Sequence, residues 1–144
     1  MPFTNFKTDV HASADLLWDM MVEKIRRPDK FVPGVVSVEI LQEFSDLSVE
    51  RRMTVKDGNN SKIIREIITA DPVTRTVIFK LKDDQAYTGY VLNMVFDEDG
   101  KVELDYTMHW TPKNPDTQIN EPNWESAIHN AVLHAKKLAE AEAG

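Results

Sequence analysis

Residues 120–144 read NEPNWESAIHNAVLHAKKLAEAEAG, the longest stretch of the chain with helical periodicity. Asn120 can cap a helix and Pro122 fits a first turn, so we expect the helix to begin there. At about 100° per residue, the apolar side chains fall within one arc of roughly 140°. They are Trp124, Ala127, Ile128, Ala131, Val132, Ala135, Leu138 and Ala139. Four of them are alanines spaced i, i+4, so a facing sheet could approach closely or leave room for a guest molecule.

The rest of the chain predicts one sheet for this helix to cover. Residues 3–10 are typical of a strand, and a helix is expected from Ser13 until Pro28 stops it. Six further strands are separated by short turn signals such as Asp57-Gly58 and Asp99-Gly100. They are Val35–Phe44, Ser48–Lys56, Ser61–Ala70, Thr74–Lys82, Tyr87–Asp97 and Lys101–Trp110. We therefore expect a single α+β domain over residues 1–144, with a seven-stranded antiparallel sheet, one or two short helices after the first strand, and a long final helix.

The composition excludes several classes of function. A formal charge of −7 with no basic run argues against a nucleic-acid partner, because phosphate binding needs clustered lysine and arginine. Cysteine is absent, so disulfides and thiolate chemistry are excluded. The amino terminus lacks the apolar core of a signal peptide, and no apolar run reaches membrane-spanning length. We expect a cytoplasmic protein.

Loop lengths predict which side chains face the helices. Val102, Leu104, Tyr106, Met108 and Trp110 alternate with polar residues, so they form the inner set of the last strand. A three-residue loop at 98–100 would pair Leu92 with Tyr106 and Tyr90 with Met108. Even turns farther along would place Phe79 opposite Tyr90, and Glu66 between Phe79 and Arg51. The same register sets Arg52 opposite Arg65 on the outer face, which is unfavourable unless Glu50 screens it.

An ion pair of Arg51 and Glu66 on an otherwise apolar face is costly to desolvate, so it suggests a role in orienting a ligand. The alternative is a partly hydrated, structural pair near the rim of the sheet. Methionines on the same face would suit an adaptable pocket, although they fill irregular cores equally well. The predicted ligand-binding residues are Arg51, Met53, Glu66, Phe79, Tyr90, Leu92, Tyr106, Met108, Ala131 and Ala135.

Four segments carry a family resemblance. KIRRPDKFVPGV at 24–35, VEIL at 38–41, YTGYVLN at 87–93 and LDYTMHW at 104–110 resemble the AtaL-like subfamily of the SRPBCC superfamily. The likeness covers nearly the whole chain and implies the START or birch-pollen-allergen-like helix-grip fold, with a seven-stranded sheet wrapped around the last helix. It also implies a cavity for an apolar small molecule. It implies no agreed set of catalytic residues.

No motif indicates a metal, a cofactor or a covalent nucleophile. His129 and His134 are five residues apart, not the four that would put two ligands on one helix face. The leading hypothesis is a protein that binds a hydrophobic or aromatic small molecule in a cavity between the curved sheet and the last helix, where Arg51, Glu66 and the tyrosines Tyr90 and Tyr106 orient it. A cyclase- or dehydratase-like enzyme is the second, with Glu66 as base, Arg51 as an oxyanion contact and Tyr90 or Tyr106 as donor. The third is a protein-interaction module with a filled core, such as a homodimer.

Overall fold

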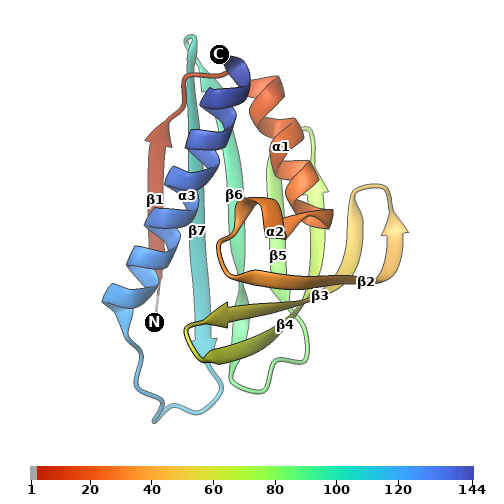
Figure 1. Cartoon of the computed structure of the whole chain (residues 1–144), viewed down its shortest axis with the longest axis vertical. Helices are drawn as coiled ribbons and strands as arrows, with labels where there is room; N and C mark the ends of the chain where they lie inside the picture. Colours follow the sequence, from red (N-terminus) through yellow and green to blue (C-terminus); the bar gives the residue numbers. More distant parts are fainter. Residues whose placement is uncertain (1–2) are drawn as a thin grey trace.

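A computed structural model describes residues 3–144, apart from the side chain of Asp57, and shows one antiparallel sheet with three helices (Figure 1). The strands are β1 (Thr4–Asp9), β2 (Val35–Ser45), β3 (Ser48–Asp57), β4 (Asn60–Asp71), β5 (Thr76–Leu81), β6 (Tyr87–Glu98) and β7 (Lys101–Pro112). Their order in the sheet is β1-β7-β6-β5-β4-β3-β2. The predicted α+β class and seven-stranded antiparallel sheet are confirmed.

The helices are α1 (Ala14–Arg26), α2 (Pro28–Phe31) and α3 (Glu121–Ala143). All three lie on one side of the sheet, and α3 runs along β1 and β7 (Figure 1). Ser13 caps α1 by accepting a hydrogen bond from the Leu16 amide, and Asn120 caps α3 through the Asn123 amide. No helix within residues 3–144 combines the length and hydropathy needed to cross a bilayer.

The turn between β6 and β7 differs from the expectation and reverses the faces of β6. Asp99 and Gly100 both have positive φ, 54° and 78°, and Glu98 pairs directly with Lys101. The connection is therefore a two-residue turn with left-handed conformations at both positions, which Asp-Gly favours, and not a three-residue loop. Asn93 pairs with Tyr106 as a result. A shift of one residue turns Tyr90 and Leu92 outward and brings Asn93 inward.

The pairing of β3 with β4 matches the expectation. Arg51 lies opposite Glu66, and Arg52 lies opposite Arg65. The unfavourable contact between the two outer arginines is relieved because Arg52 pairs with Glu39 and Arg65 pairs with Glu50. Between β4 and β5 the register is shifted by two residues, so Leu81 and not Phe79 faces Glu66. An even shift keeps Phe79 on the inner face, where it is buried.

The alanine row of α3 is covered along only part of its length. Ala135 and Ala139 are completely buried, so the carboxyl-terminal half of the helix packs flush with its neighbours. Ala131 is half-buried and Ala127 is exposed. The expectation that the whole row faces the sheet is therefore wrong at Ala127. The neighbouring elements therefore cover this face of α3 less completely toward its first turns.

Candidate functional site

Arg51 lies at the centre of a buried polar cluster on the inner face of the sheet. Its Nη1 donates to the carbonyl oxygens of Ile25 at 2.8 Å and Lys24 at 3.2 Å, at the end of α1. Its Nη2 donates to Glu66 Oε1 at 2.8 Å. These two helix carbonyls have no partner within the helix, and the helix dipole is negative there, which favours a guanidinium. The ion pair thus joins β3, β4 and α1, and it lies under α1 and not under the alanines of α3.

Lys24 and Asn93 extend this cluster toward β6. Lys24 is 6% exposed, and its Nζ donates to Asn93 Oδ1 at 2.7 Å. The same Nζ lies 4.2 Å from the centroid of the Tyr106 ring and 5.1 Å from that of Phe79. A cation above two aromatic faces recovers part of its lost hydration. Lys24, Arg51, Glu66, Asn93 and Tyr106 therefore form one buried cluster, which we call the inner cluster.

Methionine side chains border the inner cluster. The Tyr106 hydroxyl is within 3.6 Å of Met21 Sδ, and Arg51 Nη2 is within 3.6 Å of Met53 Sδ. Thioether sulfur is a weak acceptor, so the tyrosine hydroxyl is only weakly satisfied. Burial raises the pKa of Tyr106 far above its ordinary value, so this group stays protonated and acts as a donor.

Two further donors in the inner cluster have no hydrogen-bond partner within the described part of the chain. Arg51 Nε and Asn93 Nδ2 are both inaccessible to solvent and unbonded. A buried unpaired donor costs about 1–3 kcal/mol, so native proteins normally supply an acceptor, a water or a ligand. Because the unsatisfied groups are all donors, a group that satisfied them would be an acceptor such as an oxygen atom.

The electrostatics of the inner cluster favour a neutral lysine. Burial, and to a smaller extent the positive charge of Arg51, lower the pKa of Lys24 from its ordinary 10.5 to about 7, although the carboxylate of Glu66 opposes the shift. Burial also lowers the pKa of Arg51, while the paired carboxylate of Glu66 raises it again. Arginine nevertheless stays charged at neutral pH. At that pH the inner cluster therefore contains one fixed ion pair and one amine that can gain or lose a proton.

Six of the ten predicted ligand-binding residues lie together on the inner face. They are Arg51, Met53, Glu66, Phe79, Tyr106 and Met108, and all are buried. Tyr90 points outward and packs against His109, and Leu92 is on the outer face opposite Thr107. For these two the expected inward orientation is wrong, because of the Asp99-Gly100 turn. Ala135 is buried in α3 and Ala131 is half-buried, both apart from the ion pair.

Lys24 and Asn93 were not predicted to be site residues, although the sequence contains an indication of each. Lys24 follows Leu17 by seven residues and Met21 by three, which places it on the buried stripe of α1. A two-residue turn at Asp99-Gly100 would have brought Asn93 opposite Tyr106.

An aromatic cluster closes the end of the sheet near the first turn of α3. The centroids of Tyr87 and Trp110 are 5.6 Å apart, and Trp124 lies 5.5 Å from Tyr87 and 6.0 Å from Trp110. Lys62 Nζ lies within 5.0 Å of the Tyr87 ring and 4.8 Å of the Trp110 ring. The three rings come from β6, β7 and α3, and the lysine comes from β4. This aromatic end adjoins the part of α3 where Ala127 is exposed.

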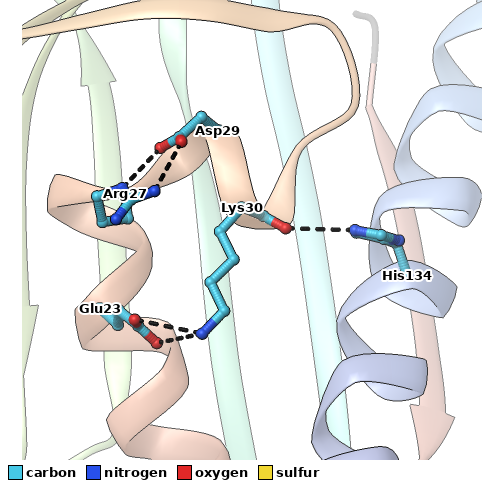
Figure 2. Close-up of polar contacts among 5 residues, drawn as sticks. All are labelled: Glu23, Arg27, Asp29, Lys30 and His134. Carbon is cyan, nitrogen blue, oxygen red and sulfur yellow. Dashed lines mark hydrogen bonds and ion pairs between the residues drawn. The ribbon is translucent and has the colours of Figure 1, made fainter.

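Polar contacts hold α2 between the other two helices (Figure 2). Lys30 Nζ donates to the carboxylate of Glu23 in α1, and the Lys30 carbonyl oxygen is 3.4 Å from His134 Nε2 in α3. Arg27 and Asp29 form a bidentate pair beside them. These contacts fix the segment that follows α1, and with it the two helix carbonyls that receive Arg51.

The best-defined surface hollows among the described residues lie elsewhere. One of about 460 Å³ is formed by side chains of β3, β4 and the 82–86 loop, including Arg52, Lys62, Arg65 and Lys82. Two of its cations, Arg65 and Lys82, already form ion pairs with Glu50. The inner cluster is thus a buried site and not an open surface pocket.

Known proteins share both the sequence pattern and the architecture described above. The profile of the family described as AtaL, acetylaranotin biosynthesis cluster protein L, matches residues 6–140. The chain belongs to the AtaL family. The chain has the helix-grip architecture of the SRPBCC superfamily, as its sequence indicates. No curated protein sequence matches it.

Solved structures share the fold of this chain at low sequence identity. TTHA0849 from Thermus thermophilus has a TM-score of 0.80 at 9% identity, over 99% of this chain and 100% of that one. Major latex-like protein 151 from Panax ginseng has a TM-score of 0.75 at 13% identity, and the match covers 98% of this chain and 96% of that one. The Zhui aromatase/cyclase from Streptomyces sp. R1128 has a TM-score of 0.63 at 19% identity, and the match covers 98% of this chain and 89% of that one. At these identities the likeness concerns the fold.

Proposed function

We propose that the chain binds a hydrophobic or aromatic small molecule on the inner face of the sheet, with an oxygen of that molecule bonded to the inner cluster. The observation that carries the proposal is the pair of buried donors without acceptors, Arg51 Nε and Asn93 Nδ2. Small-molecule sites in proteins are mostly apolar with a few convergent polar groups; the inner cluster supplies the polar groups, and the buried Met53, Phe79 and Met108 on the same face are apolar.

Apolar side chains beside the inner cluster support an organic guest. Phe79 lies under the cations of Lys24 and Arg51, Met53 Sδ lies near Arg51 Nη2, and Met108 is buried on the same face. Methionine adapts its shape to an apolar guest. The route of entry that we propose is the aromatic end, where Trp110 and Trp124 meet beside the uncovered Ala127.

A displacement assay tests the binding proposal. Wild-type protein should bind an apolar fluorescent dye, and native mass spectrometry of protein purified from its own host should show a bound compound. Met108→Trp fills the inner face and should weaken dye binding at least tenfold. Leu92→Trp is the matched control on the outer face and should leave it unchanged. A wild-type protein that binds no apolar compound would contradict the proposal and leave the interaction-module hypothesis.

A cyclase- or dehydratase-like enzyme is the second candidate. The description of the family refers to a biosynthesis cluster, and one structural neighbour is an aromatase/cyclase. The inner cluster supplies an acid–base set of the right kind: a carboxylate in Glu66, a cation in Arg51 and a neutral donor in Tyr106. Tyr90 has no part in it, since it points outward.

Glu66→Gln separates the two candidates. The substitution keeps an acceptor for Arg51 but removes the base. For an enzyme, turnover of a candidate polyketide-like substrate should fall at least a hundredfold while substrate binding persists. Equal turnover by wild type and variant would exclude Glu66 as the base.

A further inference from the structure

We propose that Lys24 is a carbonyl-reactive amine, whose Nζ adds to an aldehyde or ketone held at the inner cluster and forms a Schiff base with it. This inference names the reactive group of the guest, and it rests on the proposed function, because the carbonyl compound has to reach the inner face.

The bonding of Lys24 differs from that of a structural buried lysine. A buried ammonium normally pairs with a carboxylate. Lys24 Nζ instead donates to a neutral amide oxygen, Asn93 Oδ1, and Glu66 is committed to Arg51. No ion pair of Lys24 is found among residues 3–144. A neutral amine can make the same hydrogen bond, so the site accommodates Lys24 without its charge.

The groups around Lys24 come from four strands. Arg51 approaches from β3, Glu66 from β4, Asn93 from β6 and Tyr106 from β7. Desolvation beside another cation is the arrangement that activates lysine nucleophiles. With a pKa lowered to about 7, close to half of Lys24 is neutral at pH 7. An ordinary exposed lysine is neutral in only about one molecule in a few thousand at that pH.

The reaction needs no cofactor and no oxidant. The lone pair of neutral Nζ attacks the carbonyl carbon, a C–N bond forms, and the C=O pair moves onto oxygen. That oxygen takes a proton that Nζ loses, which gives a carbinolamine. A further proton from solvent then releases the oxygen as water while nitrogen forms the C=N bond. The sum is amine plus carbonyl compound plus one proton giving protonated Schiff base plus water.

The donors without hydrogen-bond partners support the assignment of Lys24 as the reactive amine. Asn93 Nδ2 belongs to the same amide that accepts from Lys24, and Arg51 is bonded to the Lys24 carbonyl. A carbonyl or carbinolamine oxygen beside Nζ would be an acceptor for Asn93 Nδ2, whose amide already touches Nζ. Donors positioned where negative charge develops on oxygen stabilise such additions.

Reductive trapping in the wild-type protein tests the inference. Benzaldehyde or the smaller acetaldehyde is added with cyanoborohydride, which reduces a Schiff base to a stable secondary amine, and peptide mapping gives the rate at each lysine. Lys24 should be labelled at least tenfold faster than exposed Lys137 at pH 7, with a rate midpoint near that pH. Mapping separates this label from the terminal amine. Labelling of Lys24 at or below the rate of Lys137, or none, would overturn the inference.

Two variants check the assignment by intact mass. Lys24→Arg keeps a cation but removes the amine, so the single fast adduct should disappear. Lys137→Met is the matched control and should retain that adduct. The wild-type mapping stands even if Lys24→Arg does not fold. Dye binding measured on the same wild-type sample distinguishes the two failures: binding without fast labelling overturns only the reactive amine, whereas loss of both contradicts the proposed function as well.

Discussion

Arg51 connects more parts of the molecule than any other side chain of the inner cluster. Its guanidinium bonds two carbonyls of α1, the carboxylate of Glu66 and the sulfur of Met53. A buried ion pair adds little net stability, because desolvation offsets the attraction. Removing one partner is costly, however, since the other charge is then left unpaired in the interior. The contribution of Arg51 is thus to fix α1 on the sheet.

Glu66→Leu should therefore destabilise the protein by about 3–5 kcal/mol. The double variant Arg51→Met/Glu66→Leu should recover much of this loss, because it buries no uncompensated charge. Urea unfolding followed by circular dichroism gives both values. The exposed pair Arg27–Asp29 in Figure 2 is the matched control, and Asp29→Ala should change stability little. A double variant no more stable than Glu66→Leu would argue that Arg51 is held mainly by the α1 carbonyls.

Lys24 should make stability depend on pH. Its pKa is about 7 in the folded protein and near its ordinary 10.5 in the unfolded chain. Between these values the unfolded chain binds more protons, so the free energy of unfolding rises with pH. The destabilisation is complete below about pH 7 and absent above about pH 10.5.

Comparison with Lys24→Met isolates this effect, because other groups cancel in the difference. Relative to the variant, the wild type should gain a few kcal/mol between pH 7 and pH 10, at about 1.4 kcal/mol per unit of pKa shift. Urea unfolding at several pH values measures the gain. A constant difference across that range would mean that Lys24 keeps its ordinary pKa.

At the scale of elements, β6 depends on two glycines with different demands. Gly100 has a φ of 78° with open space around it, whereas Gly89 has a φ of 126° and lies against β7. A Cβ at Gly89 would lie 2.0 Å from the carbonyl oxygen of His109, which is backbone and cannot yield. Gly89 thereby lets the backbones of β6 and β7 approach closely at His109 and Trp110.

Gly89→Ala should cost on the order of 4 kcal/mol, and Gly100→Ala about 1–2 kcal/mol, because only the first adds a backbone collision to the strain of positive φ. Thermal unfolding with tryptophan fluorescence suits the comparison, since Trp110 is opposite Gly89. Equal losses for the two variants would show that β7 moves aside.

The α3 row offers a second matched pair. Ala135 is completely buried and Ala127 is exposed. Ala135→Leu should overpack the interior and cost about 1–3 kcal/mol, while Ala127→Leu should stay within about 0.5 kcal/mol of wild type. Chemical denaturation of both variants measures the contrast. A large loss at Ala127→Leu would place that side chain against the sheet.

The elements were predictable because hydrophobic period and turn residues are local properties. The sequence predicts every strand to within a few residues, and the inner face of β7 follows from its alternation. The face of β6 does not follow, because its residues Tyr90, Leu92 and Met94 are as apolar as Val91 and Val95. Only the length of the Asp99-Gly100 turn decides between them, and one residue reverses the answer.

At the scale of the whole molecule, the helices divide the inner face between them. The carboxyl-terminal half of α3 covers β1 and β7, and α1 covers the inner cluster from the side of β6. Strand pairing alone predicts the Arg51–Glu66 pair on the inner face, but not whether the pair is buried or lies near the rim. The expectation that the last helix lies over the pair is wrong, because α1 also has an apolar face and its last carbonyls bond Arg51. Because α1 lies over the pair, its residue Lys24 becomes part of the site.

The central proposal is that the inner cluster receives an oxygen of an organic guest. A crystal structure of the protein purified from its own host, at a resolution that separates water from carbon compounds, tests this most directly. We predict continuous density of an organic molecule, with an acceptor within hydrogen-bond distance of Arg51 Nε and Asn93 Nδ2. Isolated water at both donors, or side chains that close on one another without a guest, would contradict it.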